Sequence, residues 1–491
     1  MRSDYILLLP VLLPVLAAVP LAFIQFKSRR GIRVYTFLIL ALEAAACVGL
    51  AAAGSGLSLQ LISFTQNLVL YLHIDTLSSV FLVLISCVWL LSGLFSFEYL
   101  EHEENEKSYY VIYLVVVGVL TGLATSGNLL TFYIFYELMS LTSMPLVLHT
   151  GTHESVMAAL KYLFYSIAGA LMSLFGIFVM SYISGAGSLE FTAGGILTSE
   201  EPSALLLAAV FLTILGFGTK AGLFPMHAWL PTAHPVAPAP ASAVLSGVIT
   251  KMGILGVIRS VYYVAGADLI RGTWVQYTWI TLALLTVFMG SMLAYKEKIL
   301  KKRLAYSSVS QVSYVMFGLS VLTPAAFVGA LLHVIFHALA KNTLFLSAGA
   351  IIHKTGKTRV DELEGIGKQM PVTMWCFTFA SLSLIGIPPL CGFVSKWYLA
   401  TGALDSGIAV ASWLGPVILL VSALLTAGYL LPVIVKGFIP GKEFDYTLLE
   451  KKEPGWKMLV PLVILAALSL LLGVFPGGLT DILTDIASGI L

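Results

Sequence analysis

The chain has 491 residues, of which 58% are hydrophobic and only 11% are charged. Soluble proteins carry about a quarter of their residues as charged side chains, so this composition excludes a soluble enzyme. The net charge of +2 gives no support for a nucleic-acid partner.

Apolar segments of roughly 20 residues, the length that crosses a bilayer as a helix, recur along the whole chain. They predict an all-α polytopic membrane protein, because transmembrane β-strands would be shorter and would alternate apolar with polar residues. Short linkers make residues 1–491 a single transmembrane domain of about fourteen spans. In chain order these are 5–25, 33–53, 74–97, 110–125, 128–148, 157–183, 204–230 (interrupted), 238–264, 275–294, 303–321, 325–350, 372–403 (interrupted), 411–435 and 457–475.

Basic side chains are distributed unevenly between the two sides of these spans. If the N-terminus lies outside and the spans alternate, only Arg2 and Arg271 fall in outside segments. Cytoplasmic loops carry the excess of Lys and Arg, so the pattern predicts both termini outside. We expect a prokaryotic cytoplasmic (inner) membrane. The basic residues of the inside loops are Lys27, Arg29, Arg30, Arg33, Lys107, Lys296, Lys298, Lys301, Lys302, Arg303, Lys354, Lys357, Arg359, Lys368, Lys436, Lys442, Lys451, Lys452 and Lys457.

Several charged residues fall inside the predicted spans, where a centred charge costs about 2.5–3.5 kcal/mol on insertion scales. Glu137, Lys220, Lys251 and Lys396 lie in mid-span or beside a break. Mid-membrane Lys and Glu can pair as ions or share a proton, which is the chemistry of a proton relay. The remaining residues can snorkel or reach an interface, and two of them stay secondary candidates. The remaining set is Lys161 and Lys341, the secondary candidates, with Arg259 and Glu43.

Two apolar segments are interrupted by prolines, at KAGLFPMHAWLP (220–231) and at LIGIPPLCGFVSKWYL (384–399). Proline removes a backbone donor, and lipid cannot satisfy the carbonyls that this frees. Such breaks therefore survive where protein or water surrounds them. Matched breaks in two halves of a transporter indicate an ion path near the midplane.

The chain divides into two comparable units of five helices, over 110–264 and 275–437, preceded by residues 1–109 and followed by 457–491. Each break then falls in the fourth helix of its unit, which is helix 7 and helix 12 of the chain. The third helices contain the similar stretches KYLFYSIAGA and KNTLFLSAGA. Because each unit has an odd number of helices, the two repeats must be inverted relative to one another.

Histidines and cysteines indicate which chemistry the spans can carry. His227 and His234 flank the first break, and His333 and His337 share one helix face at i and i+4. The pair can be hydrogen-bonded core histidines, two zinc ligands or a titrating wire. No third ligand and no HExxH accompany them, so we favour the wire, because imidazole changes charge near neutral pH. The four cysteines form no CxxC pair and give no support for a metal or haem site.

With these residues the chain resembles the antiporter-like membrane subunits shared by respiratory complex I, Mrp-type cation/proton antiporters and membrane-bound hydrogenases. The resemblance covers nearly the whole chain. By length and by the lysine at position 396 the chain is most similar to the D-type subunit of the Mrp antiporters, or to its equivalents in hydrogenases and the smaller complex I subunits. The stretches that carry it are FYELMSL around Glu137, ALKYLFYS around Lys161, residues 218–253, RLAYSSVSQVSY (303–314), HVIFHALAKNTLFLSAG (333–349) and GIPPLCGFVSKWYL (386–399).

The resemblance implies a lateral hydrated axis across the membrane interior. It implies that Glu137 pairs with Lys220, and it places Lys251 at the centre of helix 8. His333, His337 and Lys396 complete the implied proton path.

The function expected from the residues and the resemblance is that of a proton-translocating component of a multisubunit ion-pumping complex. The alternative is an Mrp-type component of a secondary Na+/H+ antiporter, and a non-transporting scaffold or a solitary transporter also stays open. We expect no redox chemistry and no cofactor in this chain, with protons, and Na+ as an open second choice, as the transported ions. Partners would be other membrane subunits, peripheral redox subunits in a redox-driven complex, and the lipid bilayer.

Overall fold

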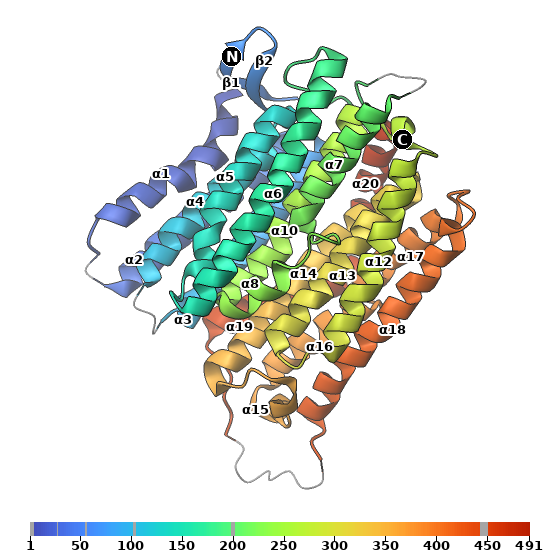
Figure 1. Cartoon of the computed structure of the whole chain (residues 1–491). Helices are drawn as coiled ribbons and strands as arrows, with labels where there is room; N and C mark the ends of the chain where they lie inside the picture. Colours follow the sequence, from blue (N-terminus) through green and yellow to red (C-terminus); the bar gives the residue numbers. More distant parts are fainter. Residues whose placement is uncertain (1–3, 27, 55, 102–104, 198–201, 442–449) are drawn as a thin grey trace.

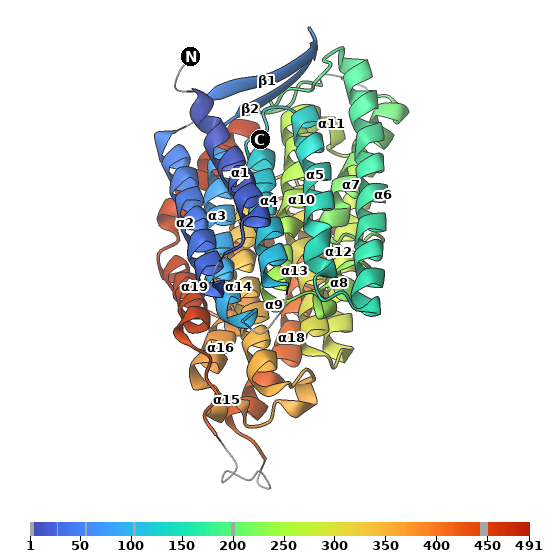
Figure 2. The same cartoon turned by 90° about the vertical axis from the view of Figure 1, so that its left-hand side faces the viewer.

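The computed structural model describes residues 4–26, 28–54, 56–101, 105–197, 202–441 and 450–491. Long helices run side by side through the molecule, and a two-stranded hairpin lies across one end (Figures 1 and 2). The elements are η1 (Asp4–Leu8), α1 (Leu9–Phe23), α2 (Arg29–Ala53), β1 (Ser58–Thr65), β2 (Leu68–His73), α3 (Thr76–Tyr99), α4 (Glu106–Ala124), α5 (Leu129–Leu148), α6 (His153–Ser184), α7 (Ala204–Ala221), α8 (Leu230–Val236), α9 (Ala239–Val244), η2 (Leu245–Ile249), α10 (Thr250–Ile258), η3 (Arg259–Ala265), α11 (Ala267–Ile270), α12 (Trp274–Lys296), α13 (Leu300–Ser320), α14 (Pro324–Thr355), η4 (Val360–Glu362), α15 (Ile366–Gln369), α16 (Pro371–Ile385), α17 (Cys391–Leu404), α18 (Ala411–Phe438), α19 (Trp456–Val474) and α20 (Gly477–Ile490).

Twelve membrane-crossing segments, each long and apolar enough to span a bilayer, occur in the part of the chain that the structure describes. The predicted all-α polytopic architecture is therefore confirmed. The two other predicted spans, 303–321 and 372–403, correspond to α13 and to the pair α16–α17. α13 has the length but carries many Ser and basic residues, and α16 and α17 have only 15 and 14 residues. The count of fourteen and the inverted repeats stay predictions.

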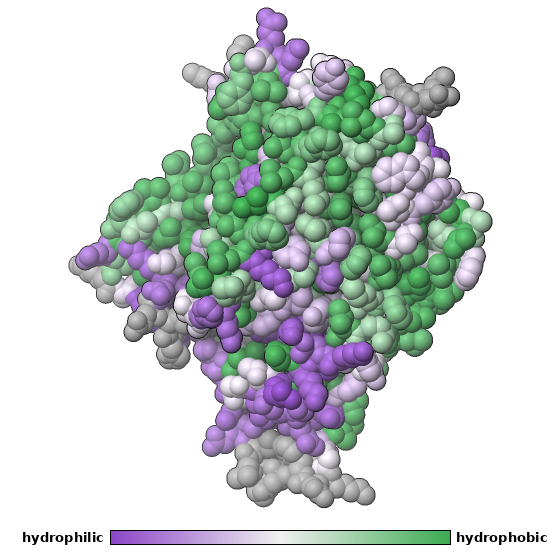
Figure 3. Space-filling model, viewed as in Figure 1, coloured by the Kyte–Doolittle hydropathy of each residue, from purple (hydrophilic) through white to green (hydrophobic). Residues whose placement is uncertain are grey.

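The two ends of the bundle differ in what they carry. The first described helix, η1, and the last, α20, lie toward the same end, which we name the terminus end (Figures 1 and 2). Basic residues such as Lys298, Lys354 and Lys368 lie at the opposite end, named the basic end, where hydrophilic side chains gather on the surface (Figure 3). Both ends of the described chain thus share one side. The side of the membrane that they face stays a prediction.

The centre of the bundle is built on α14 and α10. Every residue of α10 is buried, and α14 is buried almost continuously from Ala326 to Ile351. A helix that is apolar on all faces needs neighbours on all faces, and α14 packs against α3, α13, α16, α17, α19 and α20. Polar residues on these two helices are therefore shielded from lipid.

Both predicted breaks are present and have the same local cause. α7 ends at Gly222 with φ of 79°, and α16 ends at Gly386 with φ of 96°. Glycine adopts this left-handed conformation without a Cβ penalty, and it commonly terminates helices. Each break also contains one cis peptide bond, Phe224–Pro225 and Pro388–Pro389.

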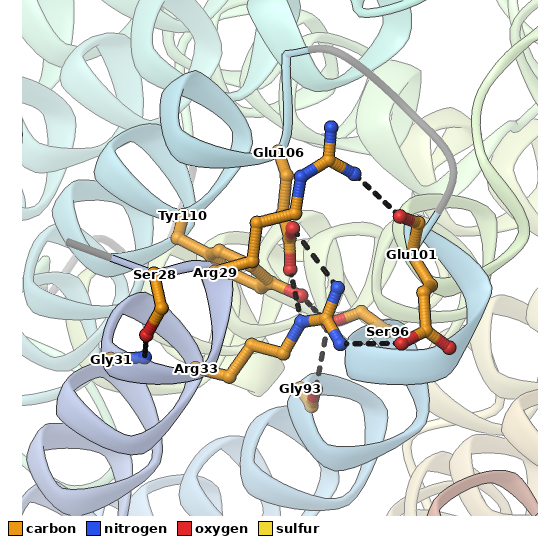
Figure 4. A network of polar contacts seen from close by, with 9 residues as sticks. All are labelled: Ser28, Arg29, Gly31, Arg33, Gly93, Ser96, Glu101, Glu106 and Tyr110. Carbon is orange, nitrogen blue, oxygen red and sulfur yellow. Dashed lines mark hydrogen bonds and ion pairs between the residues drawn. The ribbon is translucent and has the colours of Figure 1, made fainter. Parts of the chain in front are cut away.

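A polar network at the basic end joins α2 to α3 and α4 (Figure 4). The guanidinium of Arg33 contacts Glu106 at 2.6 Å and Glu101 at 3.1 Å, while Arg29 donates to the carbonyl of Glu101. Ser96 donates to the Tyr110 hydroxyl and the Gly93 carbonyl. Arg33 is only 9% exposed, although its place in the sequence predicts an inside loop. Its charge is neutralised within the protein.

Two elements are not expected from the sequence pattern. Strands β1 and β2 pair as an antiparallel hairpin, in a segment that reads as a linker between spans. The hairpin is fixed to the bundle because Asn128 donates to the Val69 carbonyl and Tyr71 donates to the Gly127 carbonyl. The C-terminal tail forms α20, which packs on α14 with its apolar face. Both elements cover the terminus end.

Candidate functional site

Lys220 lies in the last turn of α7, directly before the first break. Its side chain is fully buried, and its Nζ donates to the hydroxyl of Tyr162 at 2.6 Å and of Ser166 at 2.7 Å. The ammonium also lies 3.9 Å from the centre of the Tyr162 ring and 5.7 Å from that of Trp229. A cation at a helix C-terminus is favoured by the helix dipole. Hydroxyls and aromatic faces of α6 and the break thus replace water around this charge.

Glu137 lies on α5 and is half-buried. Its carboxylate accepts a hydrogen bond from the Tyr133 hydroxyl at 3.0 Å. Among the ion pairs shorter than 4.0 Å in the described residues, none joins Glu137 to Lys220. The implied pair is therefore not in contact in this structure. Its functional coupling stays a prediction.

Lys251 follows a π-helical turn, η2, in the middle of the bundle. Its Nζ donates to the carbonyl of Ser246 at 2.5 Å and lies 2.7 Å from Nδ1 of His337 on α14. The Ser246 carbonyl also accepts from the Thr250 hydroxyl. π-Turns inside helices recur at functional sites, and here the turn presents a carbonyl to the lysine. The structure thus brings together two residues that lie 86 positions apart.

The two histidines of α14 continue from this contact toward α17. The rings of His333 and His337 stack with centroids 6.0 Å apart. Nδ1 of His333 lies 2.9 Å from the Ser395 hydroxyl, and its ring stacks on Tyr314 at 5.4 Å. Within the described part of the chain, neither Nε2 atom has a protein hydrogen-bond partner. Buried polar atoms of this kind are commonly satisfied by ordered water.

Lys396 completes the row at the second break. Its Nζ donates to the carbonyls of Leu384 at 2.6 Å and Ile385 at 2.9 Å, which α16 leaves free where it ends. The same ammonium lies 5.1 Å from the centre of the Tyr314 ring, which also stacks on His333. Lys251, His337, His333, Tyr314 and Lys396 therefore form one continuous row of contacts, which we name the Lys–His row.

The zinc interpretation of the histidine pair can be compared with this geometry. The described residues contain no group of three or more His, Cys, Asp or Glu side chains able to hold a metal ion. The Nδ1 atoms of His337 and His333 face Lys251 and Ser395 instead. This donor set suits hydrogen bonding and proton exchange.

The secondary candidates lie on the side of the row toward the basic end and the first break. Lys341 is fully buried on α14 and donates to the Leu304 carbonyl at 3.0 Å. His234 is fully buried, with its ring stacked on Phe345 at 4.7 Å and, among the described residues, no hydrogen-bond partner for either nitrogen. His227 stacks on Phe224, and Lys161 is half-buried beside Tyr162. None of these four is in direct contact with Lys251 in the described contacts.

Sequence reasoning missed three residues of the site. Tyr162 and Ser166 hold Lys220, but isolated hydroxyls on an apolar helix carry no distinctive signal. The charge pattern assigns Lys301 to an inside loop. In the structure it is only 6% exposed and donates to the carbonyls of Pro235 and Ala237. Its position in the basic run KEKILKKR predicts an exposed loop residue, so the sequence gives no sign of its burial. The turn between α8 and α9, next to His234, is therefore bonded to a buried lysine.

Arg259, whose late position in the span predicts contact with the outer interface, lies against the start of α3 near the terminus end and is buried there. It is 2% exposed and forms an ion pair with Asp75 at 2.5 Å, with a further hydrogen bond to Ser78. Burial works against ionisation of Asp75, but the charge and hydrogen bonds of Arg259, together with those of Ser78, hold the pKa of this carboxyl well below its usual range. The pair fixes the end of the Lys251 helix to the start of α3.

The family described as "NADH:quinone oxidoreductase/Mrp antiporter, TM" matches residues 126–433. The family described as "NADH-Ubiquinone oxidoreductase (complex I), chain 5 N-terminus" matches residues 62–110. The first match spans both breaks and every residue of the Lys–His row.

Individual relatives agree with these matches. The N-type subunit of the NADH-quinone oxidoreductase of Desulforudis audaxviator is 35% identical over 82% of this chain and 82% of its own length. The D-type subunit of the Na(+)/H(+) antiporter of Bacillus subtilis is 30% identical over 95% of this chain and 93% of its own. A chain in the solved Mrp complex from Dietzia sp. superimposes with a TM-score of 0.86 at 23% identity, covering 100% of this chain and 98% of that one. The last similarity concerns the fold.

Proposed function

Because the chain belongs to the family of antiporter-like membrane subunits shared by NADH:quinone oxidoreductases and Mrp antiporters, we propose that it translocates protons as one component of a multisubunit membrane complex. The observation that carries the proposal is the contact of 2.7 Å between Nζ of Lys251 and Nδ1 of His337. It joins two exchangeable protonation sites at the buried centre of the bundle. The comparisons favour such an assembly, since a similar chain is part of the Mrp complex.

The proposed path follows the Lys–His row. A proton held on Lys251 passes to His337, then to His333, and leaves by way of Lys396 at the second break. The unpartnered Nε2 atoms of both histidines support a path completed by water. The free carbonyls of α16 stabilise the cation form of Lys396.

The proposed control of this path is the Glu137–Lys220 pair. In the structure Lys220 is bound by Tyr162 and Ser166, while Glu137 is bound by Tyr133. Movement of one charge toward the other changes the local potential. At about 4 Å and an effective dielectric constant near 20, one unit charge contributes about 4 kcal/mol to another. An energy of that size acts on a proton of the row where the moving charge comes within about 4 Å of it, so the proposal requires such an approach.

The setting of the protein follows from the same family. We place it in a prokaryotic inner membrane with both termini outside, beside other membrane subunits. No cofactor is assigned to this chain, and the transported ion is the proton. A redox-driven complex would add peripheral redox subunits. An Mrp-type assembly would exchange Na+ for protons. The similarity to two chains of such antiporter complexes supports this second candidate function.

Purification in mild detergent from native membranes tests the setting, with mass spectrometry of the proteins that co-migrate. Flavin, iron–sulfur or nickel proteins would identify a redox-driven pump, and substrate-driven proton uptake by vesicles would then be measured. Small hydrophobic antiporter proteins alone would identify the Na+/H+ exchanger, and uptake would be measured with and without Na+. A chain that migrates alone and catalyses transport contradicts the multisubunit proposal.

A further inference from the structure

An apolar cavity of about 630 Å³ lies between helices on the side of the bundle where α2, α3 and α19 are neighbours (Figure 2). Its walls come from these helices, from Ile335 and Leu339 of α14, and from α20. We name it the α3 slot. It opens to the surroundings of the protein, because Val83 and Ile482 in its lining are 37% and 44% exposed. In a membrane those surroundings are lipid or a neighbouring protein of the complex.

The slot runs along α3 from the terminus end toward the middle of the bundle. Its lining includes Thr76 at the first turn of α3 and Leu91 fifteen residues later. At 1.5 Å per helical residue, this is a length of about 22 Å. One leaflet of the hydrocarbon core is about 15 Å deep, so the slot extends through one leaflet to the bilayer centre.

The polarity of the slot changes along its length. Hydroxyls from Thr76 and Ser79 lie at the terminus end, and the thiol of Cys87 follows further along. All other lining side chains are hydrocarbon, and none is charged. The slot therefore has two hydroxyls near the terminus end, of which that of Ser79 donates to the Asp75 carbonyl, and an apolar interior below them, which suits a hydrocarbon chain.

The width of the slot distinguishes a lipid chain from a protein helix. A volume of 630 Å³ spread over about 22 Å leaves a width of about 6 Å for the centres of bound atoms, which corresponds to about 9 Å from wall to wall. An α-helix with its side chains is about 10–12 Å wide and does not fit. Hydrocarbon chains fit this width.

We propose that the α3 slot binds the acyl chain of a membrane lipid. The bound chain contacts Ile335 and Leu339, which lie two residues from His333 and His337 and hence on the opposite face of α14. It also lies beneath Ile482 and Leu479 of α20. The lipid chain completes the apolar packing behind α14 and keeps water away from that face of the helix. This inference does not depend on proton transport by the row.

Photo-crosslinking in the intact complex tests the proposal. The complex is reconstituted into vesicles of phosphatidylethanolamine and phosphatidylglycerol containing a small fraction of phosphatidylcholine with a diazirine on one acyl chain. After illumination, labelled peptides are identified by mass spectrometry. We expect label concentrated on 76–91 of α3 and on 465–482 of α19 and α20, several-fold above the lipid-exposed face of α18. Equal labelling of α18, or crosslinks from the slot to a neighbouring protein in place of lipid, would overturn the proposal.

A matched pair of variants makes the test specific. Val83→Trp fills the slot from α3, whereas Val421→Trp places the same ring on α18 at a residue of equal exposure, 38% against 37%. Val83→Trp should lower labelling of 465–482 several-fold, and Val421→Trp should leave it unchanged. If Val83→Trp does not accumulate, Ile482→Trp fills the slot from α20 and is read on 76–91. Unchanged labelling in a folded slot-filling variant contradicts a bound acyl chain.

Discussion

Lys251 and His337 meet at 2.7 Å between Nζ and Nδ1, and this contact joins the two halves of the chain at its buried centre. Lys251 comes from the helix that follows the first break, and His337 comes from the central helix α14. Both side chains are almost completely buried, at 1% exposure each. No other pair of predicted site residues is in direct hydrogen-bond contact within the described chain.

Lys251→Ala and Lys251→Arg should each nearly abolish proton translocation while the protein still accumulates. Alanine removes the proton-binding group, and arginine keeps the charge but does not release its proton. Proton uptake by inverted membrane vesicles is measured with a pH-sensitive dye and normalised to the amount of protein. Lys368→Ala, at an exposed lysine of the basic end, is the control. Normal uptake in Lys251→Arg would exclude proton exchange at this residue.

Tyr162→Phe should lower transport about ten- to hundred-fold, because a hydrogen bond to a charged group contributes about 1.5–3 kcal/mol. The substitution removes the shorter of the two hydroxyl contacts of Lys220. Tyr165→Phe deletes a hydroxyl three residues later on α6 and serves as the control. Equal effects of the two variants on initial uptake rates would show that the hydroxyl on Lys220 has no special role.

Gly253→Ala should lower the thermal stability of the protein and displace Lys220. A Cβ at this position would lie 2.5 Å from the Phe217 carbonyl oxygen and 2.8 Å from Cβ of Lys220. Overpacking of this kind costs about 1–3 kcal/mol. Gly49→Ala is the matched helical control, since its Cβ would meet nothing within 4 Å. Thermal unfolding in detergent distinguishes the two, and a Gly253→Ala protein as stable as Gly49→Ala would refute the close approach of α7 to α10.

Asp75→Asn should destabilise the protein in a way that depends on pH. The pKa of Asp75 is depressed in the folded state, so its stabilisation is fully present above the unfolded pKa of about 3.9 and decreases as pH falls through the folded value. The difference in Tm between wild type and variant should be constant from about pH 5 to 8 and shrink only in strong acid. Removing one partner of a fully buried pair costs about 3–5 kcal/mol, and the loss here should be smaller because the Asp75 side chain is 25% exposed.

The control for Asp75→Asn is a second ion pair, Asp268 with Arg271. It has a similar length of 2.9 Å, but the Asp268 side chain is 92% exposed. Exposed pairs contribute about 0–1 kcal/mol, so Asp268→Asn should leave the Tm nearly unchanged. A loss as large as that of Asp75→Asn would mean that burial is not the source of the stabilisation.

The sequence predicts those features of the fold that the bilayer itself requires. Apolar length located the spans, because a bilayer requires about 20 apolar residues from any crossing helix. Proline and glycine located both breaks, because they remove backbone hydrogen bonds inside the segment itself. Lys251 and Lys396 stood out because a charge in mid-span has no local explanation.

Contacts between residues far apart in the chain cannot be predicted from the sequence pattern. The hydroxyl of Tyr162 lies 58 residues from Lys220 in the chain, and Lys301 reaches carbonyls 64 and 66 residues away. Neither contact produces a periodic pattern. The hairpin over 58–73 was missed for a different reason, since its strands are short and lie in a linker between long apolar runs.

The ion pair between Arg259 and Asp75 holds one end of the helix that carries Lys251 against the start of α3. Arg259 lies eight residues after Lys251, so the two residues are about 12 Å apart along the helix axis at 1.5 Å per residue. A tilt of the helix by about 5° around the ion pair moves Lys251 by about 1 Å. Directed away from His337, such a displacement would lengthen the 2.7 Å contact to about 3.7 Å, beyond hydrogen-bond distance. A small rotation of this helix away from α14 would therefore disconnect the row while the contact between Arg259 and Asp75 is kept.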